Sequence, residues 1–364
     1  MTDNDWQARR DRYYEVSVRL AQTDNRQLDD MLGKSASGGG WGGTHTIKVG
    51  ADKVFVKRLL LTELEYENLF STANLYDMPT YYNYGVGSAG FGAFRELVTH
   101  IKTTSWVLDG SHANFPIMYH YRIVPASGNP KALDEERHRE YIRYWGSNSG
   151  IDRYIRERCK ATHEVVVFLE HFPHVLYHWL PKHLDKTGAL TEEMLATTAF
   201  LRANGVIHFD AHFGNIVTDG EHPYLTDYGL ALDGSFSLSA EERRFFKRHR
   251  DYDDAEFLLC LGSYITTLFG KLSPGGKQKV LRKCGLSEDP GYAELTVRLQ
   301  DNLEAIHASG LMRLDDAYVN EIVKYRAVMQ TMHRFFGALR SNDRKDTPFP
   351  QAKIRRELVS NLTQ

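Results

Sequence analysis

Acidic, amide and imidazole side chains stand among apolar residues in the stretch GVIHFDAHFGNIVTDGEHPYLTDYGLALD, residues 205–233. Asn215 follows Asp210 by five positions, and Asp227 follows Asn215 by twelve. Carboxylate and amide oxygens are ligands of Mg²⁺, which takes its remaining oxygens from water and substrate phosphates. Transfer of a phosphoryl group also requires a carboxylate that orients the attacking hydroxyl and accepts its proton. This stretch therefore predicts a Mg²⁺-nucleotide site.

Short predicted elements position these residues. The sequences NIVT (215–218) and PYLTD (223–227) are predicted strands on either side of a DGEH turn, and this hairpin is long enough to bring Asn215 and Asp227 together. The preceding segment, 191–204, is predicted to be a helix that starts at Thr191 and stops at Gly205.

A second group of candidate residues lies near the N-terminus. The sequence SASGGGWGGT, residues 35–44, contains five glycines. It precedes HTIKV, the turn GAD and the sequence KVFVKRL, which together predict a β-hairpin with Lys57 on its second strand. The loop that enters this hairpin is therefore unusually poor in side chains.

The rest of the chain supplies the framework. Helices are predicted over 5–32, 93–108 and after Ser239, and strands over 115–124 and 164–169. The segment 131–160 is rich in charged residues and is predicted to be a solvated helical insertion. Because strands dominate the first part and helices the second, the sequence predicts an α+β fold with two lobes.

Composition excludes several classes of protein. The 364 residues, 42% hydrophobic and 25% charged, are typical of a large folded domain or of two domains. The net charge of -2 argues against general binding to nucleic acid or to anionic membranes. There are only three cysteines, without C-x-x-C spacing, which indicates neither a disulfide framework nor a zinc knuckle and fits a reducing compartment. The N-terminus is polar, and the most apolar run, 258–270, is shorter than the about 20 residues of a membrane span. We therefore expect a cytoplasmic protein.

The order of these motifs resembles the protein-kinase-like superfamily. A glycine-rich loop, Val-x-x-Lys in KVFVK, His-x-Asp-x-x-x-x-Asn and Asp-Tyr-Gly follow one another between residues 33 and 260. The resemblance implies a two-lobed fold that binds ATP and Mg²⁺. It would comprise an N-terminal helical extension (1–32), a β-rich N-lobe (33–169) and a mainly helical C-lobe with the catalytic loop (170–364).

The resemblance also implies roles for individual residues. Asp210 resembles the catalytic base, Lys57 the lysine that binds the α- and β-phosphates, and Asn215 and Asp227 the metal-holding residues. His208 is grouped with the catalytic residues, although in such sites it often supports the loop by hydrogen bonds. Further residues implied in nucleotide binding are Ser37, Gly38, Gly39 and Gly40 in the glycine loop, Glu96 as the partner of Lys57 (with Glu65 and Glu67 as alternatives), and Glu170 and Phe172 in the hinge sequence FLEHF.

Departures from the family bear on the acceptor. His212 occupies a position where protein Ser/Thr kinases usually have lysine, and D-x-H-x-x-N is closer to aminoglycoside and choline kinases. No Ala-Pro-Glu follows Asp227, and the stretch up to Asp251 is short. The sequence thus favours a small-molecule hydroxyl acceptor over a protein Ser/Thr. The irregular glycine loop keeps a third hypothesis open, namely a nucleotide-binding pseudokinase that acts as a scaffold or regulator.

Other interpretations of single segments remain open at this level. His208 and His212 could belong to a transition-metal hydrolase site, because imidazole and carboxylate bind such metals. The histidines at 171, 174 and 178 have helical spacing and could also hold a metal. The basic segment 241–250 could be a solvated helix face or a docking surface for an anionic acceptor. Asp253 or Asp254 resembles the aspartate that braces the catalytic loop, and a helix N-cap is the alternative.

Overall fold

The computed structural model describes residues 3–33, 43–126 and 132–360. This part of the chain forms a mixed α+β protein with small antiparallel sheets. It divides into two compact units, and each unit is built from separate stretches of sequence. The first unit comprises 1–173, 208–210 and 224–246, and the second comprises 174–207, 211–223 and 247–364. Asp210 and Asp227 therefore both belong to the first unit.

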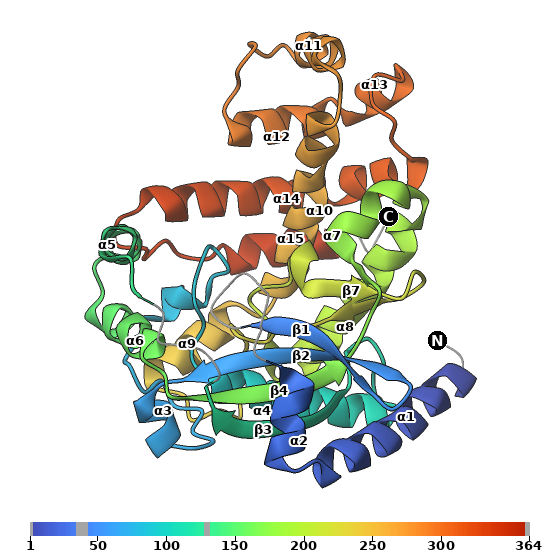
Figure 1. The fold of residues 1–364 in the computed structure, drawn as a ribbon. Coiled ribbons are helices and arrows are strands. Elements are labelled where there is room, and N and C mark those ends of the chain that lie inside the picture. The colour runs from blue at the N-terminus through green and yellow to red at the C-terminus, as the bar shows by residue number, and fades with distance from the viewer. Residues whose placement is uncertain (1–2, 34–42, 127–131, 361–364) are drawn as a thin grey trace. The chain divides into compact units, whose positions relative to one another are not determined.

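A four-stranded antiparallel sheet forms the centre of the first unit, in the order β1-β2-β4-β3 (Figure 1). Its strands are β1 (Thr44–Val49), β2 (Asp52–Leu61), β3 (Met118–Pro125) and β4 (His163–Glu170). The hairpin predicted around the GAD turn is confirmed, with Thr44 opposite Lys57 and Val49 opposite Asp52. Gly50 in the turn has a φ of 63°, a conformation that glycine adopts without steric cost. The predicted buried strand is also confirmed, because β4 is buried from Glu164 onward.

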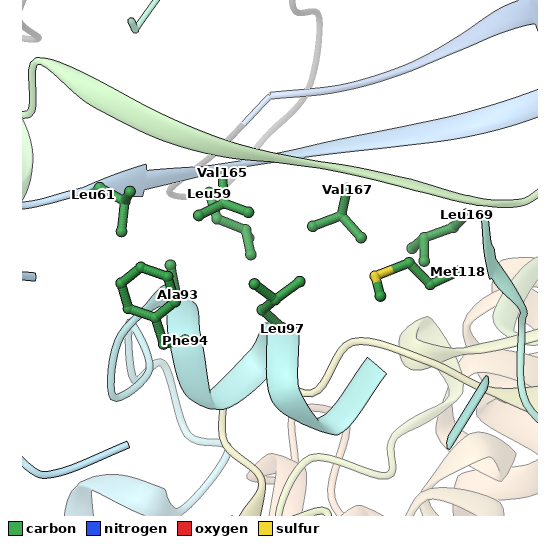
Figure 2. Packing of buried hydrophobic residues seen from close by; sticks show 9 residues of the cluster. All are labelled: Leu59, Leu61, Ala93, Phe94, Leu97, Met118, Val165, Val167 and Leu169. Atoms are coloured by element: carbon green, nitrogen blue, oxygen red, sulfur yellow. The ribbon is translucent and has the colours of Figure 1, made fainter. Parts of the chain in front are cut away.

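Helix α4 (Ala93–Leu108) covers one face of this sheet and matches the predicted helix 93–108. Figure 2 shows Phe94 and Leu97 of α4 directed at the side chains of the sheet. The sheet contributes a buried apolar layer, consisting of Leu59, Leu61, Met118, Val165, Val167 and Leu169. Burial of this layer stabilises the packing at about 25 cal/mol for each Å² of apolar surface removed from water. The position of α4 relative to β2 is thereby determined by apolar packing.

Both helices that precede the sheet belong to the first unit. They are α1 (Asp3–Gln22) and α2 (Asn25–Leu32), so the predicted helical extension is confirmed as two helices rather than one. The break occurs at Asp24, whose side chain accepts a hydrogen bond from the amide of Gln27 and caps α2. Val16 and Leu20 of α1 are buried, and α1 packs against β3 and β1.

The charged segment that was predicted as a solvated insertion is part of the core of the first unit. It forms α5 (Glu135–Tyr144) and α6 (Ser149–Cys159). Trp145, Ile151 and Ile155 are each at most 1% exposed. They pack with an aromatic cluster that includes Tyr76, Met78, Tyr82, Phe91 and Tyr154. The prediction of a solvated insertion is therefore wrong for the apolar side of these helices, which packs in the core.

The second unit is mainly helical. Its longer helices are α8 (Thr187–Ala203), α10 (Tyr252–Gly270), α11 (Pro274–Lys283), α12 (Tyr292–Asp301), α14 (Asp316–Ser341) and α15 (Gln351–Ser360). Helix α14 packs against α8, α10, α12 and α15 (Figure 1). The predicted start of α8 at Thr191 is wrong: the helix begins at Thr187, and Thr191 is buried within it.

Short elements complete both units. They are α3 (Glu63–Glu67), α7 (Leu176–Trp179), α9 (Ala240–Arg248), α13 (Leu303–Ala308), the 3₁₀ turns η1 (Thr80–Asn83), η2 (Leu180–Lys182), η3 (Leu184–Lys186) and η4 (Phe213–Asn215), and the strands β5 (His174–Val175), β6 (Val206–Ile207), β7 (Ile216–Thr218), β8 (Pro223–Leu225) and β9 (Leu232–Asp233). Strands β7 and β8 confirm the predicted strands around the DGEH turn. Past Ser239 the described residues contain helices and no strand, as predicted. Across the described ranges, every helix is too short or too polar to cross a membrane.

Candidate functional site

Lys57 reaches the candidate site from β2. Side chains alternate between the two faces of a strand, so Lys57 shares its face with Phe55 and Leu59. Both of these residues pack in the cluster beneath α4. Lys57 therefore points toward α4, and its side chain is 17% exposed.

Two carboxylates converge on the Lys57 ammonium group. Its Nζ lies 2.5 Å from Oε1 of Glu96, on the first turn of α4, and 2.8 Å from Oδ1 of Asp227. The side chain of Glu96 is 6% exposed, whereas that of Asp227 is 42% exposed. The structure thus brings together a strand lysine, a helix glutamate and the aspartate of Asp-Tyr-Gly within the first unit.

Glu65, an alternative partner for Lys57, has a different role. One of its carboxylate oxygens accepts hydrogen bonds from the amide and hydroxyl of Thr62, and the other accepts from the amide of Ala93. A side chain at Gly92 would place Cβ 2.5 Å from this carboxylate, so only glycine fits there. Glu65 therefore caps the start of α4 and helps to position Glu96. Glu67, the other alternative, is exposed.

The three charges control each other's protonation. Burial by itself would lower the pKa of Lys57, but the carboxylates of Asp227 and Glu96 outweigh it and raise that pKa above its ordinary value. Burial would raise the pKa of Asp227, but the ammonium of Lys57 lowers it to about 2. The pKa of Glu96 is lowered by the same ammonium, again against the effect of burial. At neutral pH the cluster therefore carries two negative charges and one positive charge.

Unusual backbone geometry marks both candidate loops. Phe209, directly before Asp210, has a φ of 62°, and Asp227 itself has a φ of 66°. Positive φ is uncommon in residues other than glycine, and such strain is often found at functional sites. The Phe209 ring is fully buried and stacks on Phe245 with 5.4 Å between ring centroids. This packing holds the loop in its strained conformation.

His208 connects the two loops. The imidazole is fully buried, and its Nε2 donates to the carbonyl oxygen of Thr226 at 3.0 Å. Its Nδ1 accepts a hydrogen bond from the amide of Asp210 at 3.2 Å. These bonds assign the neutral tautomer with the proton on Nε2. These bonds are of the loop-supporting kind that the sequence analysis gave as an alternative to a catalytic role for His208.

Other predicted site residues belong to the second unit. Asn215 is the last residue of η4 and is buried. His212 caps η4, since its Nδ1 accepts a hydrogen bond from the amide of Gly214 at 3.0 Å. The amide of Ala211 donates to Oε2 of Glu256 at 2.9 Å, and Glu256 is a buried residue of α10. The carboxylate that braces this loop is thus Glu256, which the sequence analysis missed.

The aspartates that were predicted as a brace or as a cap have other positions. The N-cap residue of α10 is Asp251, so Asp254 is not the helix cap. Its contacts also differ from those of a residue that braces the catalytic loop. The Asp254 carboxylate accepts hydrogen bonds from Thr198 and Arg202 of α8. Asp253 lies in the same first turn of α10 and is buried. The physical reason for Asp254 is helical periodicity: Glu256 stands two positions further along α10 and therefore lies on a different side of the helix.

The structure describes only some of the residues that the resemblance implies in nucleotide binding. Ser37, Gly38, Gly39 and Gly40 lie outside the described residues. At the end of that loop, the carbonyl of Gly43 accepts a hydrogen bond from the amide of Arg58 at 2.9 Å. The loop therefore joins β1 beside the strand position of Lys57, where the resemblance places the phosphates.

The predicted hinge residues Glu170 and Phe172 both make contacts within the first unit. The amide of Glu170 donates to the carbonyl of Ile117 at 2.8 Å, and its carboxylate forms an ion pair with Arg9 at 2.6 Å. The amide and the carboxylate of Glu170 are thus engaged in contacts within the protein. Phe172 lies two residues beyond and stacks on Tyr224, with 4.0 Å between ring centroids.

The donor groups bear on which metal the site could hold. Within the ranges that the structure describes, His, Cys, Asp and Glu side chains form no group of three or more that could hold a metal ion. This finding argues against the transition-metal site around His208 and His212 and against a metal on the histidines at 171, 174 and 178. Mg²⁺ differs, because it often takes only one or two protein oxygens. The partly exposed carboxylate of Asp227 fits that requirement.

No protein-family model matches this chain, and a search of curated proteins finds no significant match.

Proposed function

We propose that this protein is an ATP- and Mg²⁺-dependent kinase with a two-lobed, protein-kinase-like fold, and that it transfers the γ-phosphoryl group of ATP to a hydroxyl. The observation that carries the proposal is the position of Lys57 between Glu96 and Asp227. Charged groups are costly to bury, and strongly perturbed pKa values at a cluster of this kind are typical of functional sites.

Lys57 would bind the α- and β-phosphates of ATP. Its pKa is raised by the two carboxylates, so the ammonium stays charged at neutral pH. Glu96 holds the ammonium from the buried side of the site. A fixed positive charge that does not need to reorganise during the reaction stabilises phosphate charge more effectively than a mobile one.

Asp227 and Asn215 would hold the Mg²⁺ ion. The low pKa of Asp227, about 2, keeps its carboxylate ionised and ready to bind a hard cation. When bound, Mg²⁺ neutralises charge on the phosphates. The strained φ of Asp227 and the hydrogen bond that His208 donates to the carbonyl of Thr226 keep that carboxylate in one orientation.

Asp210 would be the base. Phosphoryl transfer breaks the bond between the γ-phosphorus and the β,γ-bridging oxygen and forms a bond to the acceptor oxygen, and ADP leaves. The proton of the acceptor hydroxyl passes to the Asp210 carboxylate. The hydrogen bond from the Asp210 amide to His208 holds the backbone of this residue in place.

The acceptor that we favour is a small molecule with a hydroxyl group. The segment after Asp227 runs only from residue 228 to residue 239 before α9 begins at Ala240, which leaves little chain for docking a peptide. His212 occurs in place of the lysine that is usual in protein Ser/Thr kinases. A protein Ser/Thr kinase and a nucleotide-binding pseudokinase are the alternatives that the following experiment separates.

The test is to incubate the protein with γ-labelled ATP, Mg²⁺ and a cell extract, and to follow the label into small molecules and proteins. We expect label in a small-molecule fraction. Label in protein would favour the protein kinase, and ATP binding without ADP formation or label transfer would favour the pseudokinase. A protein that shows no binding of ATP with Mg²⁺ would contradict the proposal.

Lys57→Met is the matched variant for this assay. It removes the charge and keeps most of the side-chain length, so we expect ATP affinity or kcat/KM to fall by at least about tenfold. Lys53→Met is the control, because Lys53 is an exposed lysine on the same strand. Unchanged turnover in Lys57→Met would remove Lys57 from the site.

A further inference from the structure

Arg9 of α1 is buried beside Glu170 of the sequence FLEHF (168–172), the hinge that by its resemblance to kinases would present backbone groups to adenine. Its guanidinium forms an ion pair with Glu170 at 2.6 Å, and the side chains of the two residues are 7% and 5% exposed. The Nε of Arg9 also donates to the same carboxylate, at 3.0 Å. Two adjacent donors on one carboxylate form the planar, bidentate arrangement for which arginine is suited and lysine is not.

The same guanidinium organises the chain in front of β3. It donates to the carbonyl oxygens of Ala113 and Phe115, each at 2.7 Å. The carboxylate of Glu170 accepts from the amide of Ile117 at 3.2 Å. Arg9 and Glu170 together therefore hold the backbone at residues 113, 115 and 117, next to the end of β4.

A stack of side chains extends from Arg9 to the hinge. The guanidinium carbon lies 5.1 Å from the centroid of the Tyr224 ring, and Tyr224 stacks on Phe172 at 4.0 Å. A cation over an aromatic face is attracted by the negative charge of the ring. Through Tyr224, Arg9 limits the positions that Phe172 can adopt.

Helix α1 is held along its whole length, so Arg9 does not depend on one contact for its position. The indole of Trp6 donates to the carbonyl of Val107 at 2.6 Å, and the hydroxyl of Ser17 donates to the carbonyl of Tyr119 at 2.6 Å. At the C-terminal end of α1, the guanidinium of Arg122 donates to the carbonyl of Leu20 at 3.2 Å. Helix α1 is thus an integral part of the first unit.

We infer that Arg9 is a positioning residue for adenine binding, and that α1 serves as a brace for the hinge of the nucleotide site. The inference rests on the proposed function. Arg9 touches no nucleotide itself. It acts through Glu170, which orders the end of β4, and through Tyr224, which orients Phe172. Supporting residues of this kind keep binding groups within about 0.5 Å of the geometry that a ligand requires.

The experiment compares two ligands in the full-length protein: ATP, and inorganic triphosphate, which lacks the nucleoside. Both are measured with Mg²⁺ by calorimetry. We expect Arg9→Met to weaken ATP binding by at least about tenfold, because displaced contacts lose much of their binding energy. The affinity for triphosphate, which depends on Lys57 and the metal, should stay within about twofold. Arg19→Met is the control, since Arg19 lies on the same helix in an exposed ion pair with Glu15.

Each outcome has a defined consequence. A wild-type protein that binds neither ligand overturns the proposed function and, with it, the role of Arg9. A wild-type protein that binds ATP, with an Arg9→Met variant that loses both ligands equally or neither, overturns only the inference. If Arg9→Met does not fold, Arg9→Lys decides: it keeps the charge beside Glu170 but not the bidentate geometry, so its ATP affinity should fall while its triphosphate affinity does not.

Discussion

The Nε2 of His208 donates a hydrogen bond to the backbone carbonyl of Thr226, eighteen positions later in the sequence, at 3.0 Å. Because the opposite nitrogen of the same ring accepts from the amide of Asp210, one buried imidazole links the loop of Asp210 to the residue that precedes Asp227. The carboxylate proposed as the base and the carboxylate proposed as the metal ligand are therefore held by a common support.

Asp210→Asn tests the proposed base. Asparagine keeps the size of the side chain but cannot accept the proton of the acceptor, so we expect phosphoryl transfer to slow by about 10²- to 10⁴-fold. ATP-Mg²⁺ binding, measured by calorimetry, and cooperative thermal unfolding should be retained. A folded variant with the wild-type transfer rate would contradict the mechanism, and an unfolded one would indicate a purely structural role.

His212→Lys is a companion variant that tests the acceptor site. In this variant, the use of the acceptor should be impaired more than the binding of ATP.

Asp227→Asn tests the proposed metal ligand. The change removes the anionic oxygen, and we expect Mg²⁺-dependent turnover to fall by at least about a hundredfold while the fold persists. Asp219→Asn is the control, because Asp219 lies in the exposed turn between β7 and β8, where its side-chain oxygen accepts from the amides of Glu221 and His222. Asparagine can preserve that turn. Full Mg²⁺-dependent turnover in Asp227→Asn would show that the Asp-Tyr-Gly sequence has been assigned incorrectly.

Trp145→Ala tests whether residues 132–160 are part of the core. The Trp145 ring is fully buried and contacts Tyr82 edge-to-face at 4.8 Å between ring centroids. Removing a buried aromatic side chain typically lowers the free energy of unfolding by about 3–5 kcal/mol. Arg143→Ala, at an exposed position of α5, should change it by no more than about 0.5 kcal/mol. Urea unfolding provides the measurement, and equal stabilities of the two variants would favour the solvated insertion after all.

His333 predicts a pH dependence of stability in the second unit. Burial, helped by the positive charge of Arg340, lowers the pKa of His333 to about 4. In the unfolded chain the pKa is about 6.5, so the unfolded state binds more protons between these two values. The contribution of His333 is therefore fully present above pH 6.5 and is lost as the pH falls toward 4.

Urea unfolding at two pH values measures this effect. Between pH 7.5 and pH 5, His333 should account for a loss of about 2 kcal/mol in the free energy of unfolding. In His333→Gln that part of the loss should disappear, and it should persist in the control His307→Gln. His307 lies in the same unit, in an ion pair with Asp316. An unchanged loss in His333→Gln would show that other groups cause the pH dependence.

The sequence alone was sufficient to identify the residues whose chemistry is local. Lys57 stands on a strand with a clear alternation of side chains, and Asp210, Asn215 and Asp227 follow one another at short spacings in the sequence, which is why they could be proposed as site residues. Periodicity also predicted the first hairpin, β4 and α4, because a helix or strand that buries one face must repeat apolar residues at its own period.

Only the tertiary structure decided which distant residues meet. Glu96 rather than Glu65 pairs with Lys57, because α4 packs across the sheet and Glu65 is used to cap that helix. Glu256 rather than an aspartate of the preceding turn supports the loop after Asp210. Such pairs depend on how helices pack against sheets and against one another, and the period of a single segment carries no information about its partner.

The same reason applies to the charged segment and to the N-terminus. The composition of 131–160 records its many exposed charges, whereas the burial of Trp145 follows from a partner surface that lies elsewhere in the chain. Arg9 carries no local sign of burial, and its ion pair with Glu170 joins positions 161 residues apart. Contacts of that kind become defined only when the helices and the sheet are packed, since only packing removes the competing partner, water.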